Sequence, residues 1–143
     1  MLGCEKDDFC IDPVTPNMVI RFYDASDPSK TKSVTNLTVH PVGLEAVYSN
    51  VSRDSISIPL NVGAAQTQYY FYAGGNQDLL TISYEVEKVF VSRSCGFKAI
   101  FNNLSVTSET TNDWILGVTA ILENSVLIPT IDNELAAHVQ IFH

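Results

Sequence analysis

The chain has 143 residues, of which 45% are hydrophobic and 17% are charged, so it is long enough for one domain with an apolar core, and its composition is not that of a disordered protein. The formal net charge is −8, and the eight Lys and Arg residues do not cluster in the sequence, which excludes a phosphate-neutralising nucleic-acid surface and argues against attachment to an anionic membrane through basic residues. No stretch approaches the roughly 18 uninterrupted apolar residues of a membrane-spanning helix.

Residues 1–16 are predicted to form a tether ahead of the fold. Leu2-Gly3-Cys4 matches the end of a bacterial lipobox, in which a small residue precedes the cysteine that receives diacylglycerol, and the polar stretch 5–8 suits a spacer between bilayer and domain. A frayed N-terminus with a free thiol is the alternative. No leader with a basic and an apolar region precedes this stretch, so we expect either a cytosolic chain or, with Cys4 lipidated, an exported chain whose leader has been removed.

The two remaining cysteines, Cys10 and Cys95, form an even pair once Cys4 is assigned to lipid, which predicts a disulfide bond in an oxidising compartment. The bond would close a loop of about 85 residues and stabilise the fold by on the order of 4 to 5 kcal/mol on the chain-entropy model. Two small buried thiols are the alternative. Because no CxxC or HxxxH spacing occurs, the sequence does not predict a zinc site.

Residues 18–60 alternate between apolar and polar side chains in short segments separated by turn residues, which predicts strands with one face toward a core. The inward residues expected from this alternation are Met18, Ile20, Phe22, Leu37, Val39, Ile56, Ile58 and Leu60, and a short strand is expected around Val47. Pro59 cannot donate a hydrogen bond to a strand ladder, so it indicates an edge strand or the end of a strand.

The most aromatic stretch of the chain is TQYYFYA at residues 67–73, which favours a strand and is ended by Gly74-Gly75. Strand alternation sends one pair of rings into the core and the other pair, Tyr70 and Tyr72, to the outer face. Exposed tyrosines of this kind stack on sugars or anchor protein partners, so we take these two residues as a candidate ligand surface. A strand that is buried on both faces is the alternative.

The longest run with strand character spans residues 79–95, and its alternation changes phase after Val86. This change predicts a bulge near Glu87-Lys88 or a strand that crosses the corner of a sandwich. The next row expected to face the core is Cys95, Phe97, Ala99 and Phe101.

The C-terminal part is predicted to add further strands. A row at alternate positions comprises Trp114, Leu116, Val118, Ala120 and Leu122, and Glu123-Asn124 suits a hairpin turn. In the last strand we expect Val139 and Ile141 to face inward and His138 and Gln140 to face outward. Since the best helical candidate, around 132–138, is a single short turn, residues 17–143 are predicted to fold as one all-β domain. We expect an antiparallel, immunoglobulin-like β-sandwich of about eight strands, with a closed barrel as the alternative.

The sequence contains no arrangement typical of catalysis or cofactor binding. There is no GxSxG elbow, phosphate loop or dinucleotide fingerprint, and the three histidines, His40, His138 and His143, are scattered and predicted to be ordinary surface residues. Asp24 and Asp27 lie in a turn-like stretch, where turn chemistry is a better explanation than a calcium site. We therefore expect no enzymatic activity, no metal and no cofactor.

Four stretches carry a resemblance to a known family: GCEKDDFC at the start, TPNMVIRFYD, IPLN followed by TQYYFY, and SCGFKAIFNNLSV. With them, the chain resembles an uncharacterised family of Bacteroidetes lipoproteins, a domain of unknown function, over residues 4 to about 106. The resemblance implies a lipidated Cys4 and a β-sandwich beyond the membrane, and the acidic residues after Cys4 resemble a surface-display signal. Asp54-Ser55-Ile56 looks like the short O-glycan acceptor motif of these bacteria, which makes Ser55 a candidate glycan site. In a bacterial host, the three Asn-x-Ser/Thr sequons at Asn36, Asn50 and Asn103 carry little meaning.

Together these features predict an outer-membrane lipoprotein, periplasmic or at the cell surface, that acts as a non-catalytic protein-binding or accessory module of the envelope. A carbohydrate-binding module that uses the exposed aromatic residues of strand 69–72 is the alternative. The expected partners are the membrane, through Cys4, and an envelope protein or a glycan.

Overall fold

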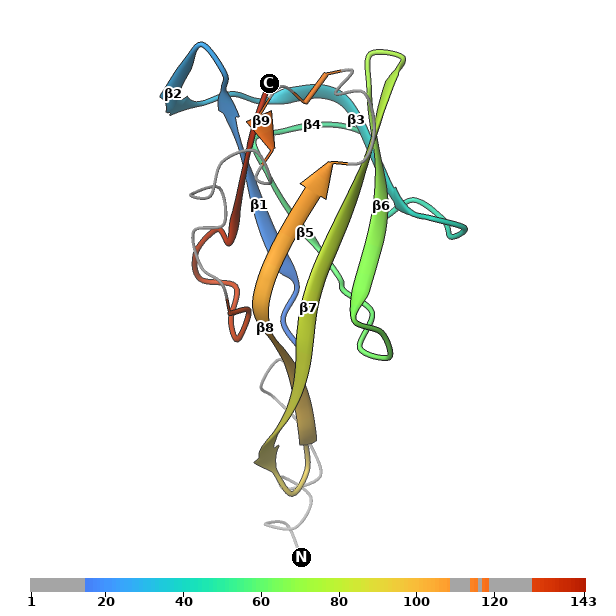
Figure 1. Ribbon diagram of the computed structural model, residues 1–143, viewed down its shortest axis with the longest axis vertical. Helices are drawn as coiled ribbons and strands as arrows, with labels where there is room; N and C mark the ends of the chain where they lie inside the picture. Colours follow the sequence, from blue (N-terminus) through green and yellow to red (C-terminus); the bar gives the residue numbers. More distant parts are fainter. Residues whose placement is uncertain (1–14, 109–113, 116, 119–129) are drawn as a thin grey trace, which may run out of the picture.

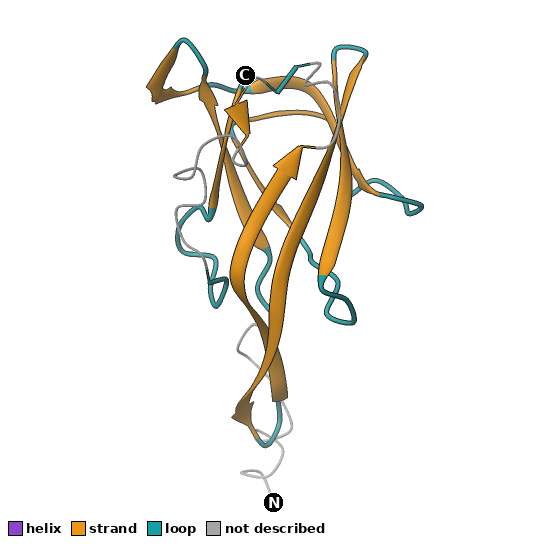
Figure 2. Ribbon diagram, in the orientation of Figure 1, coloured by secondary structure: helices purple, strands orange, loops and turns teal. Residues whose placement is uncertain are grey.

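The computed structural model describes residues 15–108, 114–115, 117–118 and 130–143. These residues form ten strands and no helix (Figures 1 and 2). The strands are β1 (Met18–Asp24), β2 (Asp27–Thr31), β3 (Val34–Pro41), β4 (Tyr48–Arg53), β5 (Ser55–Ile58), β6 (Gln66–Ala73), β7 (Asn76–Ser92), β8 (Gly96–Ser108), β9 (Gly117–Val118) and β10 (Val139–Phe142). The predicted all-β class is confirmed.

The strands are arranged in two sheets that pack face to face as a β-sandwich. The first sheet has the order β2-β1-β10-β9, with β5 also paired to β1, and the second has the order β4-β3-β6-β7-β8. Every pairing is antiparallel except that of β1 with β10, where Ile20 lies opposite Val139 in a parallel register. The two ends of the described chain are therefore joined in the middle of one sheet, a feature that the alternation pattern does not predict.

The core lies between the two sheets and is built from the residues that alternation predicts. In β1, the even-numbered Met18, Ile20 and Phe22 are fully buried, and in β7 the same phase buries Leu80 and Ile82. Burying a large apolar side chain contributes about 1.5–3 kcal/mol, so these rows supply most of the driving force for pairing the sheets. The short strand expected around Val47 begins one residue later, at Tyr48, and Val47 itself is 40% exposed.

Asn36, Asn50 and Asn103 are the three described non-glycine residues with a positive φ, at 54°, 51° and 53°. Each sits where its strand contributes one residue more than its neighbour. Asn36 lies in the shift between Val34 and Leu37 of β3, and Asn50 lies in the next shift, between Val51 and Tyr48 of β4. Asn103 lies in the shift between Asn102 and Ser105 of β8. These are β-bulges, and Asn is one of the few residues other than Gly that tolerates the left-handed region.

The bulges explain breaks in the apolar alternation. In β8, Phe101 and Leu104 are three positions apart, yet both are buried, because the extra residue at Asn103 returns the strand to its inward phase. The residues that match glycosylation sequons thus have a structural role: each precedes an apolar side chain that the bulge directs inward.

The turn between β6 and β7 consists of the predicted pair Gly74-Gly75, with φ of 59° and 86°. Two successive positive φ values are typical of the type I′ hairpin turn, which glycine adopts without strain. Pro59 directly follows the last residue of β5, so its prediction as the end of a strand is confirmed.

Strands β7 and β8 have 17 and 13 residues, whereas each of the other described strands has eight or fewer. The far end of the β7–β8 hairpin projects from the body as an arm, which we define as residues 87–98 (Figure 1). The predicted bulge near Glu87-Lys88 is wrong, because the register there is regular, with Glu87 opposite Ile100. The irregularities lie between Ser83 and Glu85 and between Phe90 and Ser92. The change of phase in the sequence instead marks the point where the strands leave the core.

Candidate functional site

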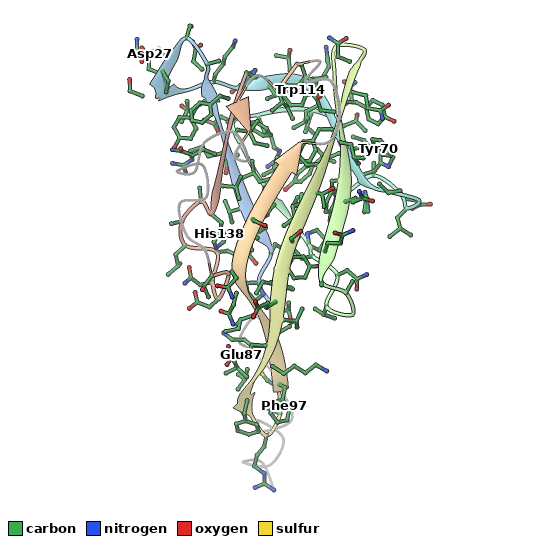
Figure 3. All side chains as sticks on the ribbon, in the orientation of Figure 1. Asp27, Tyr70, Glu87, Phe97, Trp114 and His138 are labelled. Carbon is green, nitrogen blue, oxygen red and sulfur yellow. The ribbon has the colours of Figure 1, made fainter. Side chains whose placement is uncertain are left out.

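The aromatic strand β6 divides its rings between its two faces. Tyr69 and Phe71 are 1% and 0% exposed and belong to the core, whereas Tyr70 and Tyr72 are half-buried on the outer face of the second sheet. Figure 3 shows Tyr70 on the outer side of the strand, next to β3. The predicted alternation of the four residues is confirmed, and Tyr70 and Tyr72 remain the candidate ligand surface.

A third ring completes this surface. The imidazole of His40 in β3 lies 5.4 Å from the ring of Tyr70 and 5.4 Å from that of Tyr72, with only 12° between its plane and that of Tyr72. The two tyrosine rings are 6.1 Å apart. These contacts arise because His40 pairs directly with Tyr70 across the β3–β6 ladder, which places their side chains on the same face. We call His40, Tyr70 and Tyr72 the aromatic patch.

The inward tyrosines differ from those of the aromatic patch in the use of their hydroxyl groups. The hydroxyl of Tyr69 donates to the carbonyl of Pro59, that of Tyr84 donates to the carbonyl of Asn61 at 2.7 Å, and that of Tyr48 donates to the carbonyl of Ser57. Burial raises the pKa of Tyr69 and of Tyr84. These hydroxyls are committed to the fold, as buried polar groups have to be.

His138 corrects the prediction of a surface histidine that faces outward, because it is 1% exposed. Its ring Nδ1 accepts a hydrogen bond of 2.9 Å from the backbone N–H of Val19, and the backbone N–H of His138 donates to the carbonyl of Val19 at 2.8 Å. An imidazole nitrogen that accepts an N–H carries no proton, so the ring is held neutral, and burial lowers its pKa. His138 thus adds a side-chain hydrogen bond next to the parallel β1–β10 pairing. Figure 3 labels its position.

The last residue, His143, is also tied to the backbone. Its Nε2 lies 2.9 Å from the carbonyl oxygen of Lys32, and its ring packs edge-on against Phe22 and Trp114 at 6.1 and 5.8 Å. Burial lowers its pKa as well. His40 likewise contacts the carbonyl of Pro41 through Nδ1 at 3.0 Å. All three histidines therefore have structural partners.

Asp78 is a buried carboxylate that sequence reasoning missed. It is fully buried near the start of β7, where one oxygen, Oδ2, accepts the backbone N–H groups of both Trp114 and Ile115 at 3.0 Å. The indole N–H of Trp114 donates to the carbonyl of Phe71 at 3.0 Å. The carboxylate thus anchors the segment that follows β8 onto the sandwich. The sequence gives no signal of its burial, because Asp78 follows Gly74-Gly75-Asn76-Gln77, a context typical of an exposed turn.

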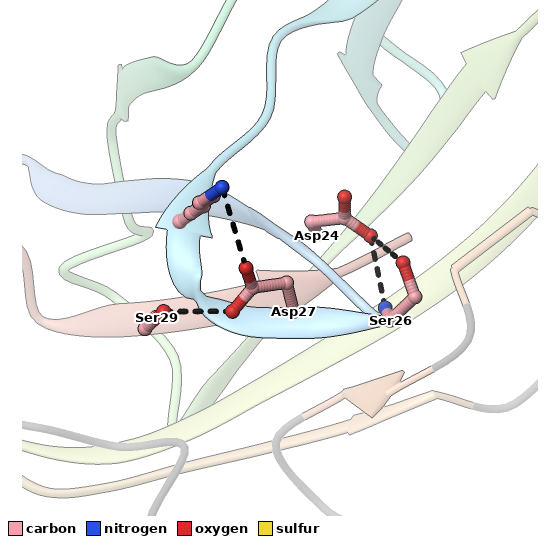
Figure 4. A network of polar contacts seen from close by, with 5 residues as sticks. Asp24, Ser26, Asp27 and Ser29 are labelled. Carbon is pink, nitrogen blue, oxygen red and sulfur yellow. Dashed lines mark hydrogen bonds and ion pairs between the residues drawn. The ribbon is translucent and has the colours of Figure 1, made fainter.

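Asp24 and Asp27 perform the predicted turn chemistry, in the connection between β1 and β2 (Figure 4). The Oδ1 of Asp24 accepts from the backbone N–H and from the hydroxyl of Ser26 at 2.9 and 2.7 Å, and these bonds lower its pKa. Asp27 accepts from the hydroxyl of Ser29 at 2.7 Å and lies 3.6 Å from the ammonium of Lys30. Among the residues that the structure describes, no group of three or more His, Cys, Asp or Glu residues could hold a metal ion.

Ser55 is the first residue of β5, at the edge of the first sheet, where it pairs with Arg21. It is half-buried, and it borders an open polar hollow whose lining also includes Tyr48 and Arg53. The preceding residue, Asp54, is exposed and accepts the N–H of Phe22 through its carbonyl. Glycosylation of Ser55 stays a prediction.

The predicted roles of Cys4 and Cys10 lie outside the described residues, so lipidation and the Cys10–Cys95 bond stay predictions. Cys95 is in the turn at the tip of the arm, where its N–H donates to the hydroxyl of Ser92 at 3.1 Å. The prediction that Cys95 shares a core-facing row is wrong. The row enters the core only at Ala99, because the residues before it belong to the projecting arm.

Several predictions for residues 109–129 cannot be followed. Leu116, Ala120, Leu122 and the turn at Glu123-Asn124 lie outside the described residues. In the described parts of the chain there is no helix of the length and apolarity that crossing a membrane requires.

Comparison with known proteins adds one finding. A model described as a family of unknown function (DUF6452) matches residues 36–143, so the chain belongs to this family. The match begins in β3, whereas the resemblance seen in the sequence began at Cys4. It confirms membership of a domain family of unknown function and bears neither on a bacterial group nor on lipid attachment. No curated protein and no solved structure gives a significant match to the chain.

Proposed function

We propose that this protein is a non-catalytic binding module of the cell envelope, held at the membrane by a lipid on Cys4, and that the aromatic patch binds its protein partner. The observation that carries the proposal is the contact of the rings of His40, Tyr70 and Tyr72 on an outer sheet face, with His40 stacked on Tyr72. Tyrosines that combine a large apolar ring with a polar tip are enriched at the centres of protein interfaces.

The hydrogen bonds that the histidines form with backbone groups support a binding role over a catalytic one. General acid–base or nucleophilic catalysis needs a titrating group that can reach a substrate. His138 and His143 instead contact backbone groups of Val19 and Lys32. The patch itself is an open arrangement of three rings on a sheet, which suits contact with a surface.

A glycan is the second candidate ligand. It is favoured by the orientation of Tyr70 and Tyr72, whose rings stand side by side with 35° between their planes and can stack on successive sugar units. A protein and a glycan would both bind through the rings of the aromatic patch. Variants of the patch therefore test whether it binds a ligand, and identification of the bound molecule shows which class of ligand it is.

Site-specific photocrosslinking in the native envelope tests this proposal. A photoreactive phenylalanine derivative replaces Tyr70, and in a matched control it replaces Leu44, which is 70% exposed on a loop. We expect a discrete protein adduct from position 70 that is absent from position 44 and is reduced about tenfold or more by Tyr72→Ala, the loss expected for an interface anchor. Equal labelling at both positions would contradict a specific surface.

Two further measurements complete the test. Binding on a glycan array that Tyr72→Ala abolishes, without a protein adduct, would replace the protein partner with a carbohydrate. Mass spectrometry of the mature protein is expected to show a diacylglycerol-modified Cys4, and an unmodified thiol there would refute the lipid anchor.

A further inference from the structure

Residues 88–98 of the β7–β8 arm, which we call its tip, have a composition unlike that of the rest of the molecule. Residues 88–98, KVFVSRSCGFK, contain three of the eight basic residues and none of the sixteen acidic ones, so this segment carries a formal charge of +3 while the rest of the chain carries −11. The three basic residues are Lys88, Arg93 and Lys98. Lys88 lies on the same face of the hairpin as Phe90 and Phe97, because Phe90 is two residues after Lys88 and pairs with Phe97. Arg93 is in the turn, and Lys98 lies on the other face, where its ammonium donates to the carbonyl of Asp132 at 3.5 Å.

Two large apolar rings are exposed on the same arm. Phe90 and Phe97 lie directly opposite each other in the ladder and are 59% and 61% exposed. Their ring centroids are 5.5 Å apart, with 75° between the planes, so they form an edge-to-face pair at the surface. Figure 3 shows Phe97 at the end of the arm, away from the sandwich. This pair makes no contribution to the core, so its exposure needs another explanation.

The acidic residues of the hairpin lie nearer the body and have partners. Glu85 accepts from the side-chain amide of Asn103 at 2.9 Å, and Glu87 accepts from that of Asn102 at 2.8 Å. Figure 3 places Glu87 between the body and Phe97. The hairpin therefore changes along its length, from hydrogen-bonded carboxylates near the body to basic and aromatic side chains at its end.

The described chain also begins beside the arm. The hydroxyl of Thr15 accepts the N–H of Ala99 at 3.1 Å, which fixes the entry of the N-terminal segment at the base of the arm. The position of the bilayer rests on the function proposed above, in which Cys4 carries a lipid. Cys4 is eleven residues before Thr15, so in an extended chain the lipid would be at most about 40 Å from Thr15. The bilayer would then lie within reach of the arm.

We propose that the tip of the arm docks on a lipid surface that carries anionic headgroups. Phe90 and Phe97 insert at the boundary between headgroups and acyl chains, where aromatic rings are favoured, while Lys88 and Arg93 contact the headgroup anions. The acidic body is repelled by the same surface, which orients the molecule with the arm toward the membrane and the outer face of the second sheet free for its partner.

Vesicle co-sedimentation of the full chain carrying Cys4→Ser tests this docking without the lipid anchor. Vesicles of phosphatidylcholine alone are compared with vesicles that also contain phosphatidylglycerol. We expect binding to the mixed vesicles, a reduction of about tenfold or more with Phe90→Ser/Phe97→Ser, and a reduction of at least about fivefold with Lys88→Gln/Arg93→Gln. The second variant also loses the preference for phosphatidylglycerol.

Matched controls come from residues outside the arm, in the β3–β4 loop and in β2. Leu44→Ser removes an apolar side chain of similar exposure, and Lys30→Gln removes an exposed basic one, and both are expected to bind vesicles like the parent chain. Far-UV circular dichroism and urea unfolding of each variant establish that it is folded.

Three results would overturn the docking proposal: no binding to mixed vesicles, equal binding by arm variants and controls, or a parent dimer that Phe90→Ser/Phe97→Ser converts to a monomer in the absence of vesicle binding. The last result would identify the arm as an interface with a second copy. Because the vesicle test contains no patch variant and no lipid on Cys4, its failure leaves the crosslinking test of the aromatic patch intact, and the converse also holds.

Discussion

Strands β7 and β8 run through both the sandwich body and the arm, and the two regions differ in what packs against these strands. At Phe101 in β8 the side chain is fully buried between the sheets, whereas four residues earlier Phe97 is 61% exposed. Both residues are paired to β7 in the same antiparallel ladder. Backbone pairing is therefore not what distinguishes the two regions. In the body the strands face an opposing sheet, whereas in the arm they do not. The arm is therefore available for contact with another surface.

The largest effect is expected from a pair of truncations that compares these two positions. Phe101→Ala removes a core ring and leaves a cavity, so the free energy of unfolding should fall by about 3–5 kcal/mol. Phe97→Ala removes an exposed ring and its edge contact with Phe90, so the decrease should be under about 1 kcal/mol. Urea unfolding measures both changes. Equal losses would contradict the division of the hairpin into body and arm.

The next largest decrease in the free energy of unfolding is expected from loss of the buried carboxylate of Asp78. Asp78→Ala leaves the N–H groups of Trp114 and Ile115 without their acceptor, which costs roughly 2–4 kcal/mol. Asp78→Asn keeps one acceptor oxygen and should lose less. Trp114 is the only tryptophan, so its fluorescence reports whether its segment separates from the body before global unfolding. A variant as stable as the parent would refute the anchoring role.

The buried His138 makes the body sensitive to acid, since its pKa is lowered in the folded state by burial. At pH values below its ordinary pKa of 6.5, the unfolded chain takes up a proton that the folded chain does not, so the free energy of unfolding should fall as the pH drops through this value. The nearby Asp132 and Glu134 oppose the shift.

His138→Asn provides the control for this pH dependence. The amide oxygen of Asn can accept the Val19 N–H in place of Nδ1 without titrating, so the variant should lose part of the decrease between about pH 6.5 and 5. Urea unfolding over this range measures the slope. A slope identical to that of the parent would show that other groups, such as His143, account for all of the acid sensitivity.

The smallest effects concern the bulges. Asn36→Gly should leave stability unchanged or slightly raised, whereas Asn36→Ala should lower it by about 1 kcal/mol, because a Cβ without a compensating polar group is disfavoured at a φ of 54°. Thermal unfolding of the two variants is the measurement. If alanine and glycine behave alike, the left-handed conformation does not limit the choice of residue there.

The rows of the core could be predicted from the sequence because alternation is a local property, as Met18, Ile20 and Phe22 show. The parallel pairing of β1 with β10 could not, because it depends on contacts between the two ends of the chain. A sequence signal for the bulges was present in the spacing of Val34 and Leu37, where two buried residues are three positions apart.

Tyr70 and Tyr72 were placed correctly by alternation, while their contact with His40 needed the β3–β6 register. The arm was missed because Phe97 continues the phase of Phe101, and phase alone does not tell whether a second sheet stands opposite. The spacing of Lys88, Arg93 and Lys98 in the sequence likewise does not show that all three lie in a projecting hairpin.

Hydrogen exchange followed by mass spectrometry, with and without mixed phosphatidylcholine–phosphatidylglycerol vesicles, tests the separate character of body and arm most directly. We expect amides of residues 80–86 and 99–106 to exchange slowly, amides of residues 89–97 to exchange fast in solution, and only the latter to slow when vesicles are added. Equal protection along the whole hairpin, or an arm whose exchange vesicles do not change, would contradict this account.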